Sequence, residues 1–151
     1  MRLRPGLITL LISTFIVYLA FAETWKIEGI SMGMDSKEVV RILGRNYRCD
    51  DLGNGSAIGL DCWFVFSEGS ANEVWVEFKD NKVRTVIGYT FDGKKCSLKR
   101  GDPASAIGCL GIPDDFDKSC KVFEQGGSRL LVFLKNDIID RIGLEWGPKI
   151  R

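Results

Sequence analysis

The chain has 151 residues, with 21 lysines and arginines against 20 aspartates and glutamates, and it has no histidine. A balance this close to neutrality argues against general nucleic-acid binding, which depends on an excess of basic side chains facing phosphates. The lack of histidine excludes Ser/His/Asp and Cys/His nucleophile systems and histidine-bearing metal sites. A Gly-x-Ser-x-Gly elbow and a P-loop are also missing from the sequence, so we predict no catalysis, no cofactor and no metal.

Residues 1–22 are typical of a signal peptide. Arg2 and Arg4 precede an uncharged, mostly apolar segment, and Ala20-Phe21-Ala22 fits a cleavage site. An uncleaved anchor is the alternative, but the segment is shorter than the roughly 20 residues that a membrane span prefers. No cysteine lies nearby to carry a lipid. We therefore expect a periplasmic or secreted protein without a stable membrane anchor, and its mature part would carry 19 basic against 20 acidic side chains.

Residues 35–44 predict a short amphipathic helix. Asp35 precedes a helical pattern of apolar residues, and Glu38 stands three residues later, which is the spacing of a capping box. Gly44 then supplies a C-terminal stop. A helix this short needs a surface on which to pack.

Strand-like segments follow at residues 63–66, 73–79 and 82–91. They are rich in β-branched and aromatic residues. Asp80-Asn81 separates the last two segments as a hairpin turn would. The order of these elements predicts a helix that packs on an antiparallel meander.

The second half of the chain repeats this order. In residues 102–111, Asp102 is the expected cap, Pro103 occupies the first helical position and Gly111 is the stop. Strand-like segments follow at 121–124, 129–135 and 138–146, with Asn136-Asp137 as the turn.

The two halves also align residue by residue. Setting Phe78 against Leu134 brings further similar pairs into register, namely Val74 with Leu130, Val76 with Val132 and Lys79 with Lys135. Such self-similarity is the mark of a repeat architecture. We predict an α+β fold of two fused repeats, residues 23–93 and 94–151. Each repeat would have a short helix or helix pair followed by an antiparallel β-meander, with the helices on one face of the sheet.

All five cysteines lie after residue 22, and an exported chain meets an oxidising compartment in which disulfides persist. Cys49 and Cys62 flank a glycine-rich stretch, and Cys109 and Cys120 take a parallel place in the second half. This placement predicts one disulfide per repeat. Pairing of Cys96 with Cys109 or with Cys120 stays open, and an unpaired Cys96 would be able to join two chains or would be buried.

The segment from Gly33-Met34-Asp35 to Gly44, followed by a Lys-Asp-Asn-Lys-Val hairpin at 79–83, resembles a known unit. It is shared by the SmpA/OmlA (BamE-like) outer-membrane lipoprotein fold and the β-lactamase inhibitor protein, and the resemblance covers residues 29–146. It implies helices on one face of an extended sheet whose other, concave face binds a protein. The chain lacks the lipidated cysteine of the lipoproteins and is shorter per copy than the inhibitor, so a β-lactamase partner is not implied.

Strand alternation independently predicts an exposed apolar patch on that sheet. Along residues 73–79, Trp75 and Glu77 fall on the face opposite Val74 and Val76. An exposed aromatic and aliphatic patch usually marks an interaction site, although another segment or a second copy of the chain would also be able to cover it. The predicted partner-binding residues are Trp63, Trp75, Glu77, Phe123, Arg129, Leu131 and Phe133.

These features predict an exported, non-enzymatic protein-binding module, either inhibitor-like or engaged in envelope interactions. Its partner would be a protein in the cell envelope or outside the cell. A carrier of a small apolar ligand in the curve of the sheet is the alternative. A hydrolase that uses the carboxylates of Asp50 and Asp51, or of Asp114, Asp115 and Asp117, is less favoured, because aspartates in loops are ordinary turn residues.

Overall fold

The structure is a computed structural model that describes residues 25–51, 60–65 and 73–146. The signal peptide expected over residues 1–22 and the glycine-rich stretch 52–59 lie outside these ranges. No helix within the described ranges is both long enough and apolar enough to cross a bilayer.

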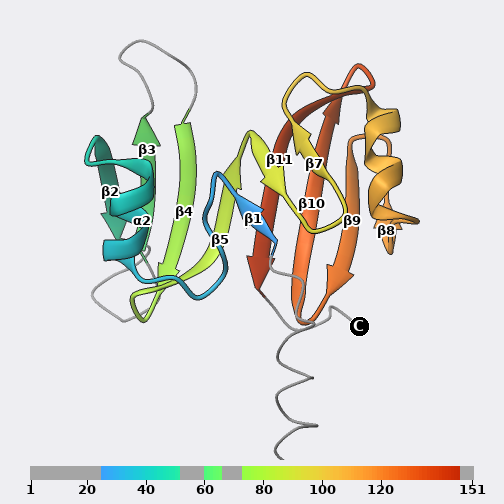
Figure 1. Cartoon of the computed structure of the whole chain (residues 1–151). Coiled ribbons are helices and arrows are strands. Elements are labelled where there is room, and N and C mark those ends of the chain that lie inside the picture. Colours follow the sequence, from blue (N-terminus) through green and yellow to red (C-terminus); the bar gives the residue numbers. More distant parts are fainter. Residues whose placement is uncertain (1–24, 52–59, 66–72, 147–151) are drawn as a thin grey trace, which may run out of the picture.

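Antiparallel β-sheet dominates the described chain, and two short helices accompany it in an α+β arrangement (Figure 1). The elements are β1 (Lys26–Ile27), α2 (Ser36–Leu43), β2 (Tyr47–Asp51), β3 (Leu60–Val65), β4 (Glu73–Lys79), β5 (Lys82–Gly88), β6 (Thr90–Asp92), β7 (Ser97–Lys99), the 3₁₀-helix η1 (Ala104–Leu110), β8 (Asp115–Phe116), β9 (Cys120–Gln125), β10 (Ser128–Lys135) and β11 (Ile138–Trp146).

The main sheet has eight strands in the order β2-β3-β4-β5-β11-β10-β9-β8. Strands from the first half of the chain form one side, and strands from the second half form the other. The two sides meet where β5 pairs with β11, antiparallel, at the centre of the sheet. Strands β2 and β8 are therefore the edges.

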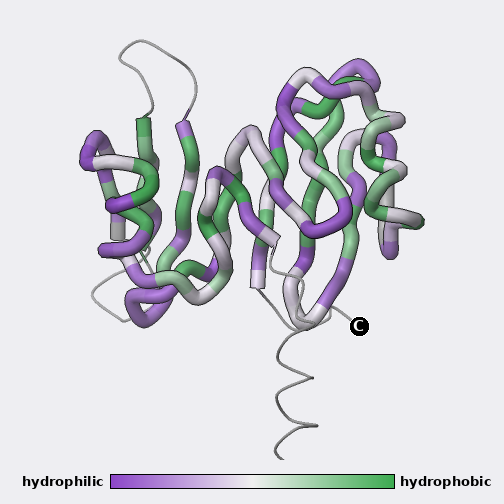
Figure 2. Tube along the Cα trace, viewed as in Figure 1, coloured by the Kyte–Doolittle hydropathy of each residue, from purple (hydrophilic) through white to green (hydrophobic). Residues whose placement is uncertain are grey.

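One face of this sheet is covered. The helix α2, the small sheet β1-β6-β7 and the helix η1 all lie against it (Figure 1). The buried apolar residues form one core cluster that draws on both halves of the chain. Hydrophobic residues accordingly follow the strands, while hydrophilic ones gather at turns such as the hairpin between β4 and β5 (Figure 2).

The helix predicted after Asp35 is present. The Asp35 carboxylate accepts a hydrogen bond from the Glu38 backbone N–H at 2.9 Å, and the Glu38 carboxylate accepts one from the Asp35 N–H at 3.0 Å. This reciprocal pair is the expected capping box. Val39 and Leu43 are buried and pack α2 onto the core.

The second helix differs from the prediction. Residues 104–110 form a 3₁₀-helix, and Pro103 is its N-cap, without a capping side chain. The carboxylate of Asp102 instead accepts a hydrogen bond from the Lys99 backbone N–H at 2.9 Å. An interior glycine, Gly108, lowers helical propensity, and the tighter helix is the result.

Corresponding irregularities occur in the two halves. The predicted hairpin turns have left-handed backbones, with φ between 52° and 60° at Asp80-Asn81 and at Asn136-Asp137. A β-bulge interrupts the register after Glu77 and again after Phe133, which are aligned positions. The turns and bulges give the two central hairpins the same shape.

The disulfides partly differ from the expected pairs. Cys49 and Cys62 face each other on β2 and β3 and are bonded. The pairing predicted between Cys109 and Cys120 is wrong, because Cys109 is bonded to Cys96. Cys120 lies on β9, whereas Cys96 precedes β7 and η1 carries Cys109, so the second bridge ties two covering segments together. Because Cys96 is bonded within the chain, its thiol is not available to join two chains.

Close packing at Gly88 holds β1 against the centre of the main sheet. A Cβ added there would lie 2.8 Å from Glu28 Cγ and 2.9 Å from Ile27 Cγ2, and Ile27 is fully buried. The Glu28 carboxylate accepts hydrogen bonds from the Tyr89 and Thr90 backbone N–H groups, both at 2.8 Å. Glycine is therefore required for this approach of two backbones.

We predict that Gly88→Ala destabilises the protein by about 1–3 kcal/mol, because the added methyl forces β1 away from the sheet. Urea unfolding would measure the loss. Gly108→Ala is the matched control, since a Cβ there meets nothing within 4 Å. Equal stabilities of the two variants would contradict the packing role of Gly88.

Candidate functional site: the open face of the sheet

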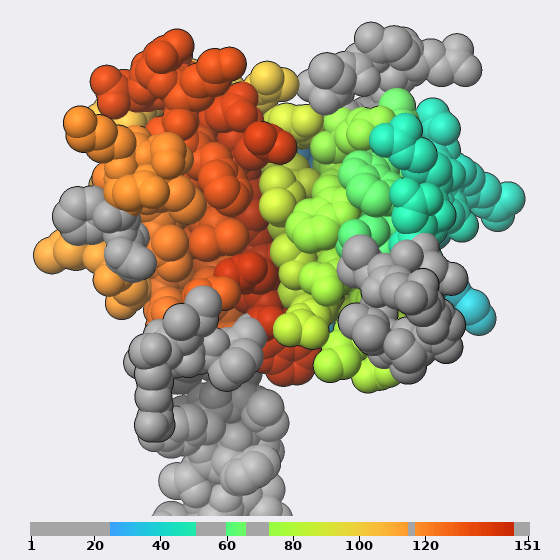
Figure 3. Space-filling model, turned by 180° about the vertical axis from the view of Figure 1, so that it is seen from behind, coloured from blue at the N-terminus to red at the C-terminus, as the bar shows by residue number. Residues whose placement is uncertain are grey.

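The face of the main sheet opposite the helices is not covered by any described helix or strand (Figure 3). We call it the open face. In Figure 3, β10 and β11 occupy one side of it and β3 to β5 the other, and the face dips along the line where β11 meets β5. Its side chains come from alternate strand positions, because successive side chains in a strand point to opposite faces.

A row of directly opposed residues crosses this face from β3 to β9. The strand register pairs Trp63 with Trp75, Trp75 with Ile87, Ile87 with Gly143, Gly143 with Leu131 and Leu131 with Val122. All members except Gly143 are partly exposed. We call this set the apolar row: Trp63, Trp75, Ile87, Gly143, Leu131 and Val122.

Gly143 makes the centre of the apolar row compact. A Cβ at this position would lie 3.3 Å from Ile87 Cγ1, 3.6 Å from Leu131 Cβ and 3.6 Å from Phe133 Cε2. Side chains of the two neighbouring strands, β5 and β10, therefore close over the glycine. The apolar surfaces of the two halves become continuous there.

A second row, which is polar, runs parallel to the first. It opposes Asp61 to Glu77, Glu77 to Thr85, Thr85 to Glu145 and Glu145 to Arg129. The Thr85 hydroxyl donates to the Glu77 carboxylate at 2.7 Å, and Arg129 forms an ion pair with Glu145. Asp50 on β2 and Glu124 on β9 extend the row at its two ends.

Asp61 is the buried acid of this row, with 7% of its surface exposed. Its Oδ1 has no hydrogen-bond partner within the described chain. Burial is the main cause that raises the pKa of Asp61, followed by the negative charge of Glu77. A hydrogen bond from the Trp75 side chain acts in the opposite direction, and the charge of Asp50 adds a smaller rise.

Arginine side chains border the apolar row. The Arg48 guanidinium lies 5.4 Å from the centre of the Trp63 ring and 3.4 Å from the Glu73 carboxylate. Arg141 is opposed to Phe133 on the next position along the strands. Aromatic rings in the middle and charges at the margin are the usual anatomy of a protein interface.

Most of the predicted binding residues lie together on this face. Trp63, Trp75 and Leu131 belong to the apolar row, Glu77 and Arg129 belong to the polar row, and Phe133 covers Gly143. Phe123 does not belong to this site. It is opposed to Leu130 and points into the core, where 4% of it is exposed. Its neighbour Val122 takes the place on the open face, since facing alternates along β9.

Sequence reasoning missed Ile87, Arg48 and Asp61. The bulge after Glu77 shifts the alternation in β5, so the facing of Ile87 could not be read from the residues 82–91 alone. Arg48 and Asp61 belong to strands β2 and β3, which begin or end beside the undescribed stretch 52–59. Their signal was the Cys49–Cys62 pair, which sets the register of these two strands.

Comparison with known proteins gives fold neighbours but no family. No protein-family model and no curated protein matches the chain. A crystal structure of a cysteine-rich secretory protein from Staphylococcus aureus is similar, with a TM-score of 0.54 and 15% identity over 76% of this chain and 44% of that one. An extracellular protein containing an SCP domain from Bacillus anthracis has a TM-score of 0.52 and 12% identity, over 76% of this chain and 43% of that chain.

These neighbours correct the expected relationship. The resemblance to the SmpA/OmlA fold and to the β-lactamase inhibitor protein is wrong, because the solved structures that the fold resembles include the secretory protein and the SCP-domain protein described above. The motif behind it, a capped helix before a tight hairpin, is short and common enough to occur in unrelated folds. The chain spans less than half the length of the two matched proteins.

We predict that Asp61→Asn stabilises the protein by about 1 kcal/mol at pH 7, because a buried carboxylate with an unpaired oxygen is costly. A raised pKa means that the folded state holds its proton at a pH where the unfolded state has lost it. Stability of the wild type therefore rises as pH falls through the folded-state pKa, and the advantage of the variant shrinks.

Urea unfolding between pH 4 and pH 8 would test this dependence. Asp50→Asn is the control, because this carboxylate is exposed and its removal should change stability less. An advantage of Asp61→Asn that stays constant across the pH range would contradict the assignment.

Proposed function

We propose that the protein is an exported, non-catalytic module that holds a protein partner against its open face. The observation that carries the proposal is the apolar row, in which two tryptophans stand opposite each other on a face that no described element covers. Tryptophan side chains contribute large contact areas at low cost in side-chain entropy and are enriched among interface hot spots.

The charged side chains of the polar row favour recognition of a specific partner over non-specific hydrophobic binding. Arg129 and Glu145 are paired with each other, and Thr85 is hydrogen-bonded to Glu77. Asp61 and Glu77, by contrast, are two acids directly opposite each other. A partner that places a basic side chain near this pair would offset the negative charge of the two acids and bury the adjacent tryptophans at the same time.

Export is supported from three directions. The two intramolecular disulfides suit an oxidising compartment. The N-terminal segment has the composition of a signal peptide. The fold neighbours are named as a secretory protein and an extracellular protein. A periplasmic or secreted location is accordingly part of the proposal.

Two of the aspartates considered for a hydrolase, Asp114 and Asp117, have local structural tasks, which favours a non-catalytic function over that alternative. Asp117 accepts hydrogen bonds from the Ser119 hydroxyl, the Ser119 N–H and the Cys120 N–H, and these bonds lower the pKa of Asp117. Asp114 accepts a bond from the Glu124 N–H at 2.7 Å.

We further propose that the two halves are copies of one unit. Support comes from the aligned bulges and left-handed turns, and from two isolated bridges at aligned places, Asp35 with Lys82 and Pro103 with Ile138. In each half the segment that leads into the helix pairs with the start of the last strand. Two copies joined through their last strands would present one continuous binding face.

The open face can be tested by comparing partner capture by matched variants. We expect Trp75→Ala and Leu131→Ala each to weaken binding of a captured partner about 30-fold or more, the loss typical of hot-spot residues. The wild-type chain, immobilised, would capture proteins from an envelope and culture-medium extract of its own cells. The affinity of each captured protein would then be measured for every variant.

Ile42→Ala is the matched control, because Ile42 is an exposed apolar residue on α2, on the covered side of the sheet. Circular dichroism would establish that each variant is folded. If the captured proteins bind Trp75→Ala and Leu131→Ala as tightly as they bind the wild type, the open face is not the binding site.

A further inference from the structure

A pocket of about 640 Å³ lies at one end of the main sheet, beside the hairpin between β4 and β5. Pockets that take small organic ligands span about 300–1,000 Å³. The hairpin between β4 and β5, the turn between β9 and β10, and the end of β11 form its wall. Its lining includes Lys79, Lys82, Val83, Arg84, Gly127 and Trp146.

The pocket exists because β5 diverges from β11 beyond their terminal pair, Thr85 with Glu145. Beyond that pair, β5 turns toward α2, where Lys82 forms a bridge with Asp35 (Figure 1). Arg84 on β5 and Trp146 on β11 occupy the next positions beyond this pair, and both line the pocket. Neither is covered by a further strand of the described chain.

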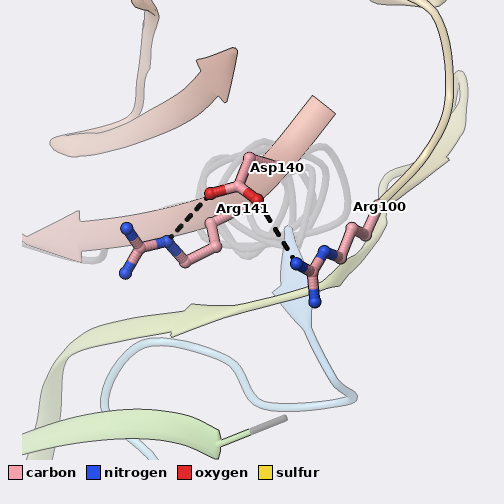
Figure 4. Close-up of polar contacts among 3 residues, drawn as sticks. All are labelled: Arg100, Asp140 and Arg141. Carbon is pink, nitrogen blue, oxygen red and sulfur yellow. Dashed lines mark hydrogen bonds and ion pairs between the residues drawn. The ribbon is translucent and has the colours of Figure 1, made fainter. Parts of the chain in front are cut away.

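The opposite end of the same junction is closed by ion pairs. Asp140, which aligns with Arg84, receives Arg100 at 3.5 Å and Arg141 at 3.4 Å (Figure 4). The Arg100 guanidinium also lies 5.2 Å from the centre of the Tyr89 ring. Asp140 therefore forms ion pairs with two arginines, whereas Arg84, at the aligned position beside the pocket, forms no ion pair with a described residue.

The three cations of the pocket have no charged partner in the part of the chain that the structure describes. Lys79, Lys82 and Arg84 form no ion pair and no side-chain hydrogen bond with another described residue. Asp80 is the one acid among the described lining residues, and it occupies the hairpin turn. Three cations converging on a concave site raise the local concentration of anions.

The body of the pocket is apolar. Trp146 is 53% exposed, and its indole lies beside Gly127, where an added Cβ would be 3.6 Å from Nε1. Val83 and the aliphatic stems of the lysines add apolar surface. A flat ring system would bury one side against the indole and keep an attached charge at the lysines and Arg84.

We infer that this pocket binds a small organic anion that has a flat apolar body. The cations Lys82 and Arg84 recognise the charge, and Trp146 stacks on the ring system. None of the described lining residues belongs to the apolar row or the polar row, and the inference does not depend on the protein-binding proposal.

Two fluorescent probes that differ in charge test the inference on the full chain: the anionic 1-anilinonaphthalene-8-sulfonate and the neutral N-phenyl-1-naphthylamine. We expect the sulfonate to bind saturably, with one molecule per chain, and the neutral probe to bind at least tenfold more weakly. A double variant, Lys82→Gln with Arg84→Gln, should weaken sulfonate binding at least tenfold and leave the neutral probe unchanged. Trp146→Ala should weaken both probes.

Two controls locate the binding. Lys135→Gln removes the cation aligned with Lys79 in the other hairpin, and Trp75→Ala alters the open face; neither should change sulfonate affinity. The inference is overturned if Trp75→Ala abolishes binding, if the neutral probe binds as tightly as the anion, or if inorganic phosphate displaces the sulfonate at equal concentration. That last result would assign the pocket to simple anions.

Discussion

The antiparallel pairing of β5 with β11 is the contact on which the rest of the structure depends. Only four residue pairs form this junction, from Ile142 with Gly88 to Glu145 with Thr85. They turn two four-stranded sheets into one sheet of eight. The core below and the apolar row above both cross it, so a break there would divide the core and the candidate binding surface together.

Two glycines make this junction possible, one on each face. Gly88 lets Ile27 and Glu28 approach the covered face, and Gly143 lets Ile87, Leu131 and Phe133 close over the open face. A side chain at either place would push apart groups that now touch. Glycine inside a strand ordinarily costs stability through chain entropy and lost packing, so its use here is explained by the close approach on each side.

Local signals in the sequence predict local structure well in this chain. The capping box at Asp35, the two hairpin turns and the alternation in β4 all depend on residues a few positions apart, and each is present. The pairing of Cys109 with Cys96 was one of the alternatives that the sequence left open. The sequence could not select it, because the choice depends on how β7 and η1 pack. The prediction that Phe123 lies on the open face was wrong for a related reason, because the register of β9 is set by its partner β10.

The same limit applies to the candidate site. Trp75 and Leu131 could be placed on one face from alternation alone, yet nothing in the sequence says that β5 and β11 are neighbours. That neighbour relation creates the apolar row and also the pocket, because two strands that pair over four residues and then diverge leave space at their ends. Long-range strand pairing therefore determines both candidate binding sites in this fold, whereas short sequence motifs determine the local turns and helix ends.

Asp61 indicates that the open face is not arranged for stability alone. A carboxylate 7% exposed, with an unpaired oxygen and Glu77 opposite, lowers the stability of the folded state at neutral pH. Its neighbours Trp63 and Trp75 add partly exposed aromatic surface. Departures from local physical preference tend to gather at functional sites, where stability is exchanged for recognition. Here both departures lie within one patch, at the same end of the open face, where a bound partner with a basic side chain would offset the charge of the two acids while it covers the tryptophans.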